Sequence, residues 1–213
     1  HESRLNHRGI RCRQLGMTMD LSNCIATIQY SLDGFSFLIY ADADDKILSL
    51  KHHDINEGNN TFRNTLKIIQ ETCELNIGDF SKVNVLVDNE ACTLVPASIF
   101  RNDAKSVYLK YLGLDNDSQI VVDYLQHAQA NNTFAISKED YEEINNLPNH
   151  CRTNHSSSVL IESLIEEYFN KQAEDRVFVN VKNMRFELTV IRGVVLTFHN
   201  TFTFKTKEDF LYF

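Results

Sequence analysis

The sequence lacks the features that mark secreted, disulfide-bonded and membrane proteins. It has no Cys-x-x-Cys pair, and its five cysteines are odd in number and widely spaced (Cys12, Cys24, Cys73, Cys92 and Cys151). This usage fits a reducing compartment better than a disulfide framework. No apolar run approaches the ~20 residues that span a bilayer, and the first residues have neither an initiator methionine nor the apolar core of a signal peptide. We therefore expect a soluble, cytoplasmic protein that does not insert into membranes.

An excess of positive charge is also missing. The formal net charge is -8, which argues against a protein whose main task is to bind nucleic acid. Basic residues gather only near the N-terminus, as Arg4, Arg8, Arg11 and Arg13. We expect residues 1–20 to be a mobile basic arm, with a nucleic-acid role as the alternative. The 43% of hydrophobic residues can form a core, and 213 residues suffice for one large domain or two small ones.

Residues 24–50 have the pattern of three consecutive β-strands. Residues 24–30 alternate, with Ile28 and Tyr30 on one face, and residues 35–40 alternate in the same way. Between them, Asp33-Gly34 is a strong hairpin signal, because glycine accepts positive φ and aspartate tolerates it. Residues 47–50 make the third strand. A helix over residues 62–73, capped by Thr61, is expected to pack on this sheet.

A second stretch near the end of the chain has the same shape. Strands are expected at residues 177–181, 186–191 and 194–204, with a turn at Arg192-Gly193. Thr206 is a candidate N-cap for a helix over the last residues. Because that helix has only about two turns, too few for stability without strong packing, we expect more chain to follow Phe213.

The residues between these two stretches predict a mixture of strands and helices. Strands are expected at residues 83–87, 92–95, 120–125, 133–136 and 151–154, with a polar loop at 129–132. Residues 97–112 predict a helix whose apolar positions are Ile99, Ala104, Val107, Tyr108, Tyr111 and Leu112. Ser137 begins a short helix with Glu139-Asp140 in its first turn. Residues 156–169 form the clearest helix, with a buried stripe of Val159, Leu160, Leu164, Ile165, Tyr168 and Phe169.

Four short segments carry a resemblance to a known family. They are Leu32-Asp33-Gly34-Phe35-Ser36-Phe37, Leu94-Val95-Pro96-Ala97-Ser98-Ile99-Phe100, Thr133-Phe134-Ala135-Ile136, and Asn200-Thr201-Phe202 through Glu208-Asp209-Phe210. Over roughly residues 20–213 the chain resembles an uncharacterised bacterial family of unknown function that has the actin-like ATPase fold. The layout is most similar to the pilus-assembly and division relatives of that fold.

The resemblance implies an α/β fold with mixed sheets, built from duplicated RNase H-like units. Residues 21–80 and 138–172 would form the first actin-like subdomain, and residues 81–137 an inserted small α/β subdomain. Residues 173–213 would begin the second actin-like subdomain, which is incomplete at its C-terminal end.

Active members of this fold bind phosphate with the first hairpin of each unit, and here both hairpins are degenerate. Tyr30 stands where the first unit needs a metal-binding aspartate, and Leu32 stands where it needs a glycine. Asn180 replaces the aspartate of the second unit, and Lys182 and Met184 replace glycines. Without a carboxylate for Mg²⁺ and without glycine-rich loops, hydrolysis of ATP is not expected. We assign no cofactor. The vestigial phosphate-loop positions are Asp33, Gly34 and Ser36.

The sequence therefore predicts a non-catalytic actin-like scaffold or protein-interaction module. Its partner would be another protein or a second copy of the chain, contacted through residues 81–137. One alternative is a nucleotide-binding actin-like ATPase. Another is an RNase H-like nuclease that gathers Asp33, Asp88 and Asp123 around metal ions.

No catalytic residue and no metal ligand is assigned from the histidines either. His52 and His53 are adjacent on a strand and point to opposite faces. The group His150, Cys151 and His155 lacks the paired spacing of a zinc site.

Overall fold

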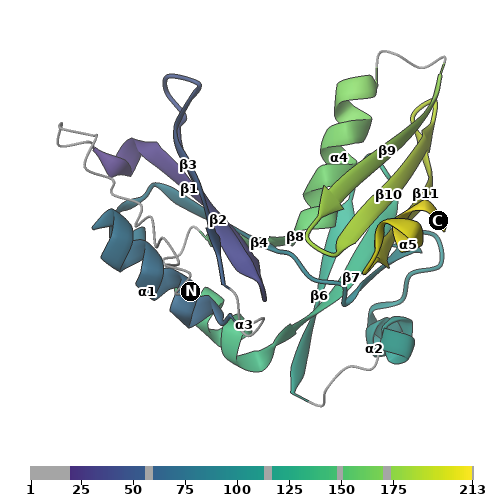
Figure 1. Cartoon of the computed structure of the whole chain (residues 1–213), viewed down its shortest axis with the longest axis horizontal. Coiled ribbons are helices and arrows are strands. Elements are labelled where there is room, and N and C mark those ends of the chain that lie inside the picture. Colours follow the sequence, from purple (N-terminus) through teal and green to yellow (C-terminus); the bar gives the residue numbers. More distant parts are fainter. Residues whose placement is uncertain (1–19, 56–59, 113–116, 148–150, 170–173, 213) are drawn as a thin grey trace, which may run out of the picture. The chain divides into compact units, whose positions relative to one another are not determined.

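The computed structural model describes residues 20–55, 60–112, 117–147, 151–169 and 174–212. The contacts between Cα atoms divide the chain into two compact units. The first comprises His1–Asn89 and Ile136–Asn154, and the second comprises Glu90–Ala135 and His155–Phe213. Each unit has its own sheets and helices (Figure 1). The expected basic arm lies outside the described residues, apart from Asp20 at its end.

The first unit is built on a five-stranded sheet with the order β3-β2-β1-β4-β8. β1 pairs with β2 and β2 with β3 in antiparallel fashion, whereas β1 and β4 are parallel. The strands are β1 (Cys24–Ser31), β2 (Gly34–Ala41), β3 (Lys46–Asp54), β4 (Lys82–Val87) and β8 (Cys151–His155). The predicted meander of three strands is confirmed, and its third strand continues past Leu50 to Asp54. The hairpin turn lies at Leu32 and Asp33, one residue earlier than predicted, because Gly34 already pairs as the first residue of β2.

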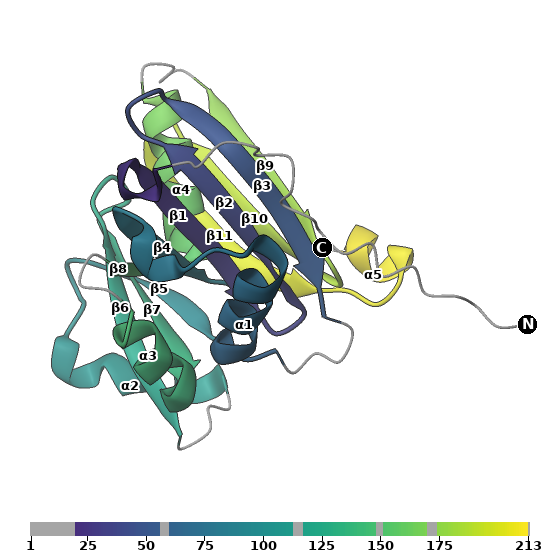
Figure 2. The same ribbon diagram turned by 90° about the vertical axis from the view of Figure 1, so that its left-hand side faces the viewer.

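One face of this sheet forms the core of the first unit. Alternate residues of β1 and β2 are buried, among them Ile28 and Phe37, as the period of two requires. Helix α1 (Phe62–Cys73) lies along this face and buries Phe62 and Ile69 (Figure 2). Thr61 caps it as predicted, since its side chain accepts the N–H of Asn64 at 3.2 Å.

Further short elements complete the first unit. Helix α3 (Lys138–Asn145) contacts α1, and the ion pair between Arg63 and Glu143 joins the two helices. The 3₁₀ turns are η1 (Leu21–Asn23) and η2 (Ile77–Asp79). Ser137 caps α3 with acidic residues in its first turn, which confirms that prediction.

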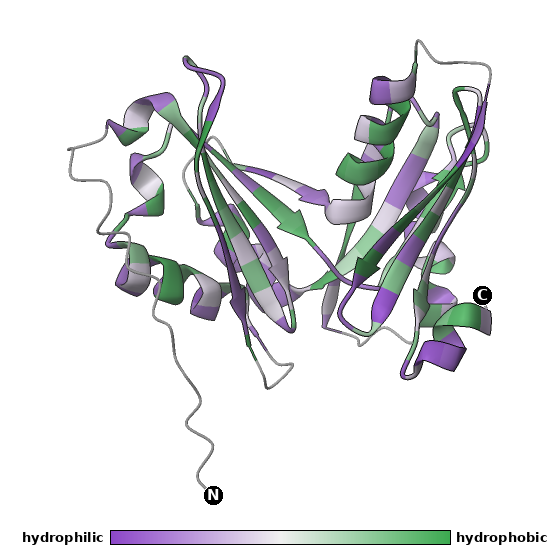
Figure 3. Ribbon diagram, turned by 45° about the horizontal axis from the view of Figure 1, so that its top comes forward, coloured by the Kyte–Doolittle hydropathy of each residue, from purple (hydrophilic) through white to green (hydrophobic). Residues whose placement is uncertain are grey.

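The second unit holds two three-stranded sheets, with the orders β5-β7-β6 and β11-β10-β9. The strands are β5 (Cys92–Pro96), β6 (Ser118–Leu125), β7 (Ala130–Ser137), β9 (Asp175–Lys182), β10 (Arg185–Arg192) and β11 (Val195–Thr203). The second predicted meander is thus confirmed as β9-β10-β11. Exposed residues alternate with half-buried ones along β9, and the strands of this sheet carry both hydrophobic and hydrophilic residues (Figure 3). A common origin of the two meanders by duplication stays a prediction, as does the division into actin-like subdomains. β4, expected in the inserted segment, pairs with β1 in the first unit.

Helix α4 (Ser156–Tyr168) joins the two sheets of the second unit. Ile161 and Ile165 of α4 form one buried cluster with Leu125 of β6 and Ile191 of β10. The predicted stripe of α4 is therefore shifted in phase, because Val159 is 39% exposed while Ile161 is fully buried. The remaining elements are η3 (Asn102–Ala104), α2 (Lys105–Tyr108), η4 (Lys110–Leu112) and α5 (Lys207–Tyr212). Thr206 caps α5 by accepting the N–H of Asp209 at 3.1 Å, as predicted.

Two segments differ from the prediction for physical reasons. Residues 97–112 form only short helical pieces, since Leu109 is the one large apolar side chain there that is fully buried. A long helix needs a buried face to hold it. Of the expected polar loop at 129–132, Gln129 lies in a turn, whereas residues 130–132 begin β7, where Asn131 and Asn132 pair with Val95 and Leu94 of β5. No helix among the described residues has the length and apolar composition to cross a membrane.

Candidate functional site

The β1–β2 hairpin contains the positions that the resemblance predicts to be vestigial phosphate-loop residues, and hydrogen bonds within the chain hold its turn. The Ser31 hydroxyl lies 2.5 Å from Asp33 Oδ1 and 3.0 Å from the carbonyl oxygen of Gly34. The carbonyl oxygen of Leu32 accepts the N–H of Asn60 at 3.1 Å. The carbonyl oxygen of Asp33 accepts the N–H of Ile55, the residue after β3, at 2.8 Å. These contacts make Asp33 a turn residue.

Gly34 is required by the packing of β2 against β3. A Cβ atom at this position would collide with the backbone carbonyl of His53 on the neighbouring strand. Glycine therefore permits the two strands to approach at this point. Its presence in the hairpin needs no bound phosphate to explain it.

The third vestigial position, Ser36, belongs to an exposed polar row on one face of the sheet. Its hydroxyl lies 3.0 Å from His52 Nδ1, and His52 Nε2 lies 2.9 Å from Asp54 Oδ1. His53 points the other way and packs its ring on Phe35, with 5.3 Å between ring centroids. The adjacent histidines thus lie on opposite faces, as predicted.

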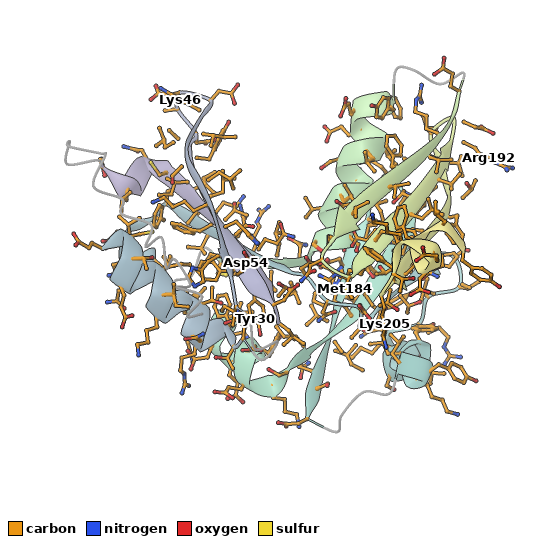
Figure 4. The ribbon with its side chains drawn as sticks, viewed as in Figure 1. Tyr30, Lys46, Asp54, Met184, Arg192 and Lys205 are labelled. Carbon is orange, nitrogen blue, oxygen red and sulfur yellow. The ribbon has the colours of Figure 1, made fainter. Side chains whose placement is uncertain are left out.

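Tyr30 lies near the end of β1 with its side chain almost fully buried (Figure 4). Its hydroxyl is 2.8 Å from Asp140 Oδ2 and 3.0 Å from the carbonyl oxygen of Asn60, so its single hydrogen has two acceptors. Asp140 Oδ1 accepts the backbone N–H of Phe62 at 2.7 Å, and Asp140 Oδ2 accepts the Ser137 hydroxyl at 2.8 Å. One buried carboxylate thereby connects β1, the start of α1 and the start of α3.

Burial raises the pKa of Tyr30 well above its ordinary value, and the hydrogen bond and the negative charge of Asp140 act in the same direction. Tyr30 is therefore a neutral phenol near neutral pH. It supplies a hydrogen-bond donor where the resemblance expects a metal-binding carboxylate.

The β9–β10 hairpin is the counterpart of this site in the second unit. Met184 lies in its turn with a φ of +56° and is 49% exposed (Figure 4). This left-handed conformation favours glycine, and a methionine there is strained. The turn thus keeps a backbone geometry suited to glycine but carries a side chain.

Glu187 on β10 is the centre of the second site and is 3% exposed. Its Oε1 accepts the Ser157 hydroxyl at 2.8 Å and lies 3.1 Å from Lys182 Nζ. Its Oε2 accepts the side-chain N–H of Asn180 at 2.8 Å. Both residues at the degenerate positions of β9, Asn180 and Lys182, are therefore engaged by one carboxylate.

The charges around Glu187 determine which form of the cluster is stable. Burial by itself raises the pKa of Glu187, but the Lys182 charge and the hydrogen bonds from Asn180, Ser157 and Lys182 outweigh it, so the pKa lies below its ordinary value. Burial lowers the pKa of the neighbouring His199, whose Nδ1 is 2.9 Å from the Thr189 hydroxyl. The cluster thus contains a charged Glu187 beside a neutral histidine near neutral pH.

The three aspartates of the nuclease alternative each have a local structural partner. Asp88 Oδ2 accepts the Gln29 side chain at 3.0 Å, and Asp123 Oδ2 accepts the N–H of His155 at 2.7 Å. Asp33 is held in its turn by Ser31. Among the described residues, no group of three His, Cys, Asp or Glu side chains could hold a metal ion.

His155 has a structural role that the sequence did not reveal. It is fully buried at the start of α4, where its Nδ1 accepts the N–H of Ser157 at 3.2 Å. Its ring packs 5.2 Å from that of Phe134. Cys151 begins β8, and His150 lies outside the described residues.

Sequence reasoning also missed the two central carboxylates. Asp140 was recognised only as an acidic residue in the first turn of a helix. Glu187 had one usable signal, which is its place among alternating apolar residues on a predicted strand. A charged residue on such a strand is buried only if it has a partner. Two of the partners of Glu187, Asn180 and Lys182, lie on the neighbouring predicted strand, whereas Ser157 comes from a segment 30 residues away.

Comparison with known structures identifies the fold. The chain is similar to a Bacteroides thetaiotaomicron protein described as having an actin-like ATPase fold and unknown function, with a TM-score of 0.81 and 19% identity. That match covers 92% of this chain and 77% of the other. It is also similar to a chain of the PilM–PilN type IV pilus biogenesis complex, with a TM-score of 0.58 and 11% identity over 86% of this chain and 62% of that one. No curated protein sequence matches.

The mixed α/β architecture with its several sheets is therefore the actin-like ATPase fold, as the resemblance implied. The family follows from the sequence itself, because nearly the whole chain aligns with one family profile. Residues 17–213 match the family described as protein of unknown function (DUF3822), and the chain belongs to that family.

Proposed function

We propose that this protein is a non-catalytic actin-like scaffold that binds another protein or a second copy of itself. The observation that carries the proposal is that both hairpins are occupied internally. Tyr30 of the first is bound to Asp140, and Asn180 and Lys182 of the second are bound to Glu187.

The chemistry of phosphate transfer supports the non-catalytic part of the proposal. Phosphoryl transfer relies on a carboxylate-held Mg²⁺ and on backbone N–H groups that approach the phosphate closely. The first hairpin offers a phenol with a raised pKa at the carboxylate position. The second offers an amide, and its lysine already has an ionic partner.

Exposed apolar residues support a contact surface within residues 81–137. Single exposed apolar residues are normal, but several in one short segment indicate an interaction site. Four lie within residues 99–112, and Tyr111 among them is 91% exposed. The four are Ile99, Val107, Tyr111 and Leu112, and Tyr124 on β6 is 59% exposed. Tyrosine is a residue type enriched in protein interfaces.

The similarity to a chain of the PilM–PilN complex supports a protein partner on different grounds. That structure shows a protein of this fold in a type IV pilus biogenesis complex. We infer an equivalent mode of action for this chain, in which the fold presents a surface to a partner and performs no hydrolysis.

Size-exclusion chromatography with light scattering, together with affinity capture from lysate, tests the proposal. The wild-type protein is expected to form an oligomer or to retain a partner in stoichiometric amount. The double variant Val107→Glu/Tyr111→Lys is expected to lose that species. The control variant Ile47→Lys changes a residue of the first unit that is 59% exposed, and it should leave the species intact. A strict monomer that captures no partner contradicts the proposal, and so does equal loss in both variants.

The nuclease alternative has its own test. It predicts metal-dependent cleavage of nucleic acid that Asp33→Asn abolishes. We expect wild-type protein and Asp33→Asn to be equally inert with Mg²⁺ and with Mn²⁺, because Asp33 is a turn residue bonded to Ser31. Cleavage by the wild type alone would establish the alternative.

A further inference from the structure

The inner face of the β9–β10–β11 sheet contains a set of donors that converge on one point. Lys182 Nζ and the Ser157 hydroxyl both lie within hydrogen-bond distance of Glu187 Oε1, at 3.1 and 2.8 Å. The Asn180 amide donates to Glu187 Oε2 at 2.8 Å. The Ser157 side chain is 1% exposed, and that of Lys182 is 16% exposed.

The fold itself fixes this convergence. Asn180 lies directly opposite Glu187 in the antiparallel register of β9 and β10. Lys182 is two residues further along β9, so its side chain leaves the same face. Ser157 comes from the first turn of α4, where the positive end of the helix dipole favours negative charge.

An ammonium, an amide N–H, a hydroxyl and a helix N-terminus are the components of a built site for an oxyanion. Such a site normally receives its anion from solution or from a ligand. In this protein the anion is a side chain of the same sheet, and it neutralises the lysine charge in a place with almost no water access.

We propose that Lys182, Asn180 and Ser157 form an oxyanion-binding site that Glu187 occupies and thereby closes to external anions. An external carboxylate of small size takes that place when the Glu187 side chain is removed. The inference deepens the proposed function and rests on its non-catalytic part, because a site filled by Glu187 gives a nucleotide phosphate nothing to bind.

Rescue by acetate tests the inference. Truncation by Glu187→Ala removes the carboxylate and leaves a polar space that matches acetate in shape and charge. We expect this variant to melt several degrees below the wild type. Acetate at ~100 mM is expected to recover about half of the Tm difference between the variant and the wild type, because a ligand that binds only the folded state raises the Tm by mass action. Equal concentrations of sodium chloride should restore none of it.

Matched controls separate site binding from a general salt effect. Glu162→Ala removes a carboxylate that accepts the backbone N–H groups of His127 and Ala128 and whose ionic partner is the His127 ring. Its Tm is expected to be insensitive to acetate. Wild-type protein and Glu187→Gln should also be insensitive, because a side chain still fills the site. In the double variant Glu187→Ala/Lys182→Ala, the acetate effect should disappear.

Three results would overturn the inference. They are an acetate response of the wild type equal to that of Glu187→Ala, no response of Glu187→Ala up to ~0.5 M acetate, and a variant that shows no cooperative unfolding at any acetate concentration. The capture experiment on Val107 and Tyr111 does not involve Glu187, so a failure of partner binding and a failure of acetate rescue are seen separately.

Discussion

The β1–β2 hairpin and the β9–β10 hairpin each stabilise a buried carboxylate, but with different donor groups. Each places a buried carboxylate beside its sheet and next to the N-terminus of the helix that packs there. Asp140 accepts the first N–H of α1, from Phe62, and Glu187 accepts a hydroxyl from the first turn of α4. In the first hairpin the strand supplies the neutral donor Tyr30, whereas in the second it supplies the cation Lys182.

The two sites stabilise their buried carboxylates in different ways. A buried carboxylate is stable only if its lone pairs are satisfied and its charge is balanced. Asp140 accepts three hydrogen bonds from neutral donors. Glu187 relies on an ion pair as well. We therefore expect the two sites to respond differently to substitution and to pH.

The largest effect is expected at Asp140. Asp140→Ala leaves the Phe62 N–H and the Ser137 hydroxyl without this acceptor and leaves the Tyr30 hydroxyl with the Asn60 carbonyl alone, which should lower the free energy of unfolding by about 3 kcal/mol. The matched control is Glu139→Ala in the same helical turn. The Glu139 side chain is 60% exposed, and its ion pair with Arg63 is long, at 3.9 Å. Because exposed ion pairs contribute little, the cost of Glu139→Ala should be at most about 0.5 kcal/mol. Urea denaturation followed by circular dichroism measures both, and equal costs would contradict the assignment of Asp140 as the centre of the site.

Glu187→Gln should have the next largest effect, at about 2 kcal/mol near neutral pH, because the Lys182 charge is left without its buried counter-ion. The pKa of Glu187 is lowered in the folded state, so its ionised form stabilises the protein fully above the unfolded pKa of about 4.3. That contribution is lost as the pH falls through the folded pKa. The difference in stability between wild type and Glu187→Gln should therefore be constant from pH 6 to 8 and should shrink below about pH 4.

The measurement is urea denaturation of both proteins across this range. A difference that grows toward acid pH would have the wrong sign and would contradict the ion pair.

Tyr30→Phe should cost less, about 1 kcal/mol, because the Asp140 carboxylate keeps two of its donors and the apolar contacts of the ring remain. Its cost should not depend on pH between 6 and 9, since the raised pKa of Tyr30 keeps the phenol protonated throughout. Parallel denaturation curves at three pH values test this. A cost that rises with pH over this range would show that the phenol ionises more readily in the folded protein than in the unfolded chain, and it would contradict the raised pKa.

The smallest effect concerns the turn of the second hairpin. Met184→Gly removes the left-handed strain of a non-glycine residue and should stabilise the protein by about 0.5 kcal/mol, after the entropy that glycine adds to the unfolded chain is subtracted. Asn183 is the neighbouring turn residue and does not have a positive φ, so Asn183→Gly should be neutral or destabilising. Thermal unfolding of the two variants decides between them.

Much of the fold could be predicted from local pattern, because the strands of the first meander alternate between buried and less buried residues and turn residues separate the strands of both meanders. The caps at Thr61, Ser137 and Thr206 could be predicted for the same reason, since a cap bonds within three residues. The prediction of one helix over residues 97–112 was wrong, because most of its apolar residues have helical spacing but are not buried.

The partners at the two sites could not be predicted from local pattern. Tyr30 and Asp140 are 110 residues apart in sequence, and Ser157 and Glu187 are 30 apart. The resemblance predicts which hairpin residues depart from the pattern of active members. The contacts that Tyr30, Asn180 and Lys182 make are set by the fold and were found only in the structure.

The most direct test of this account is thermal unfolding of the wild-type protein with and without ATP and Mg²⁺. If Asp140 and Glu187 already occupy the polar groups of the two hairpins, nucleotide at ~5 mM should not shift the Tm beyond the shift that an equal concentration of sodium sulfate with Mg²⁺ produces. A nucleotide-specific stabilisation of several degrees would show that the hairpins still bind phosphate, and it would contradict the account.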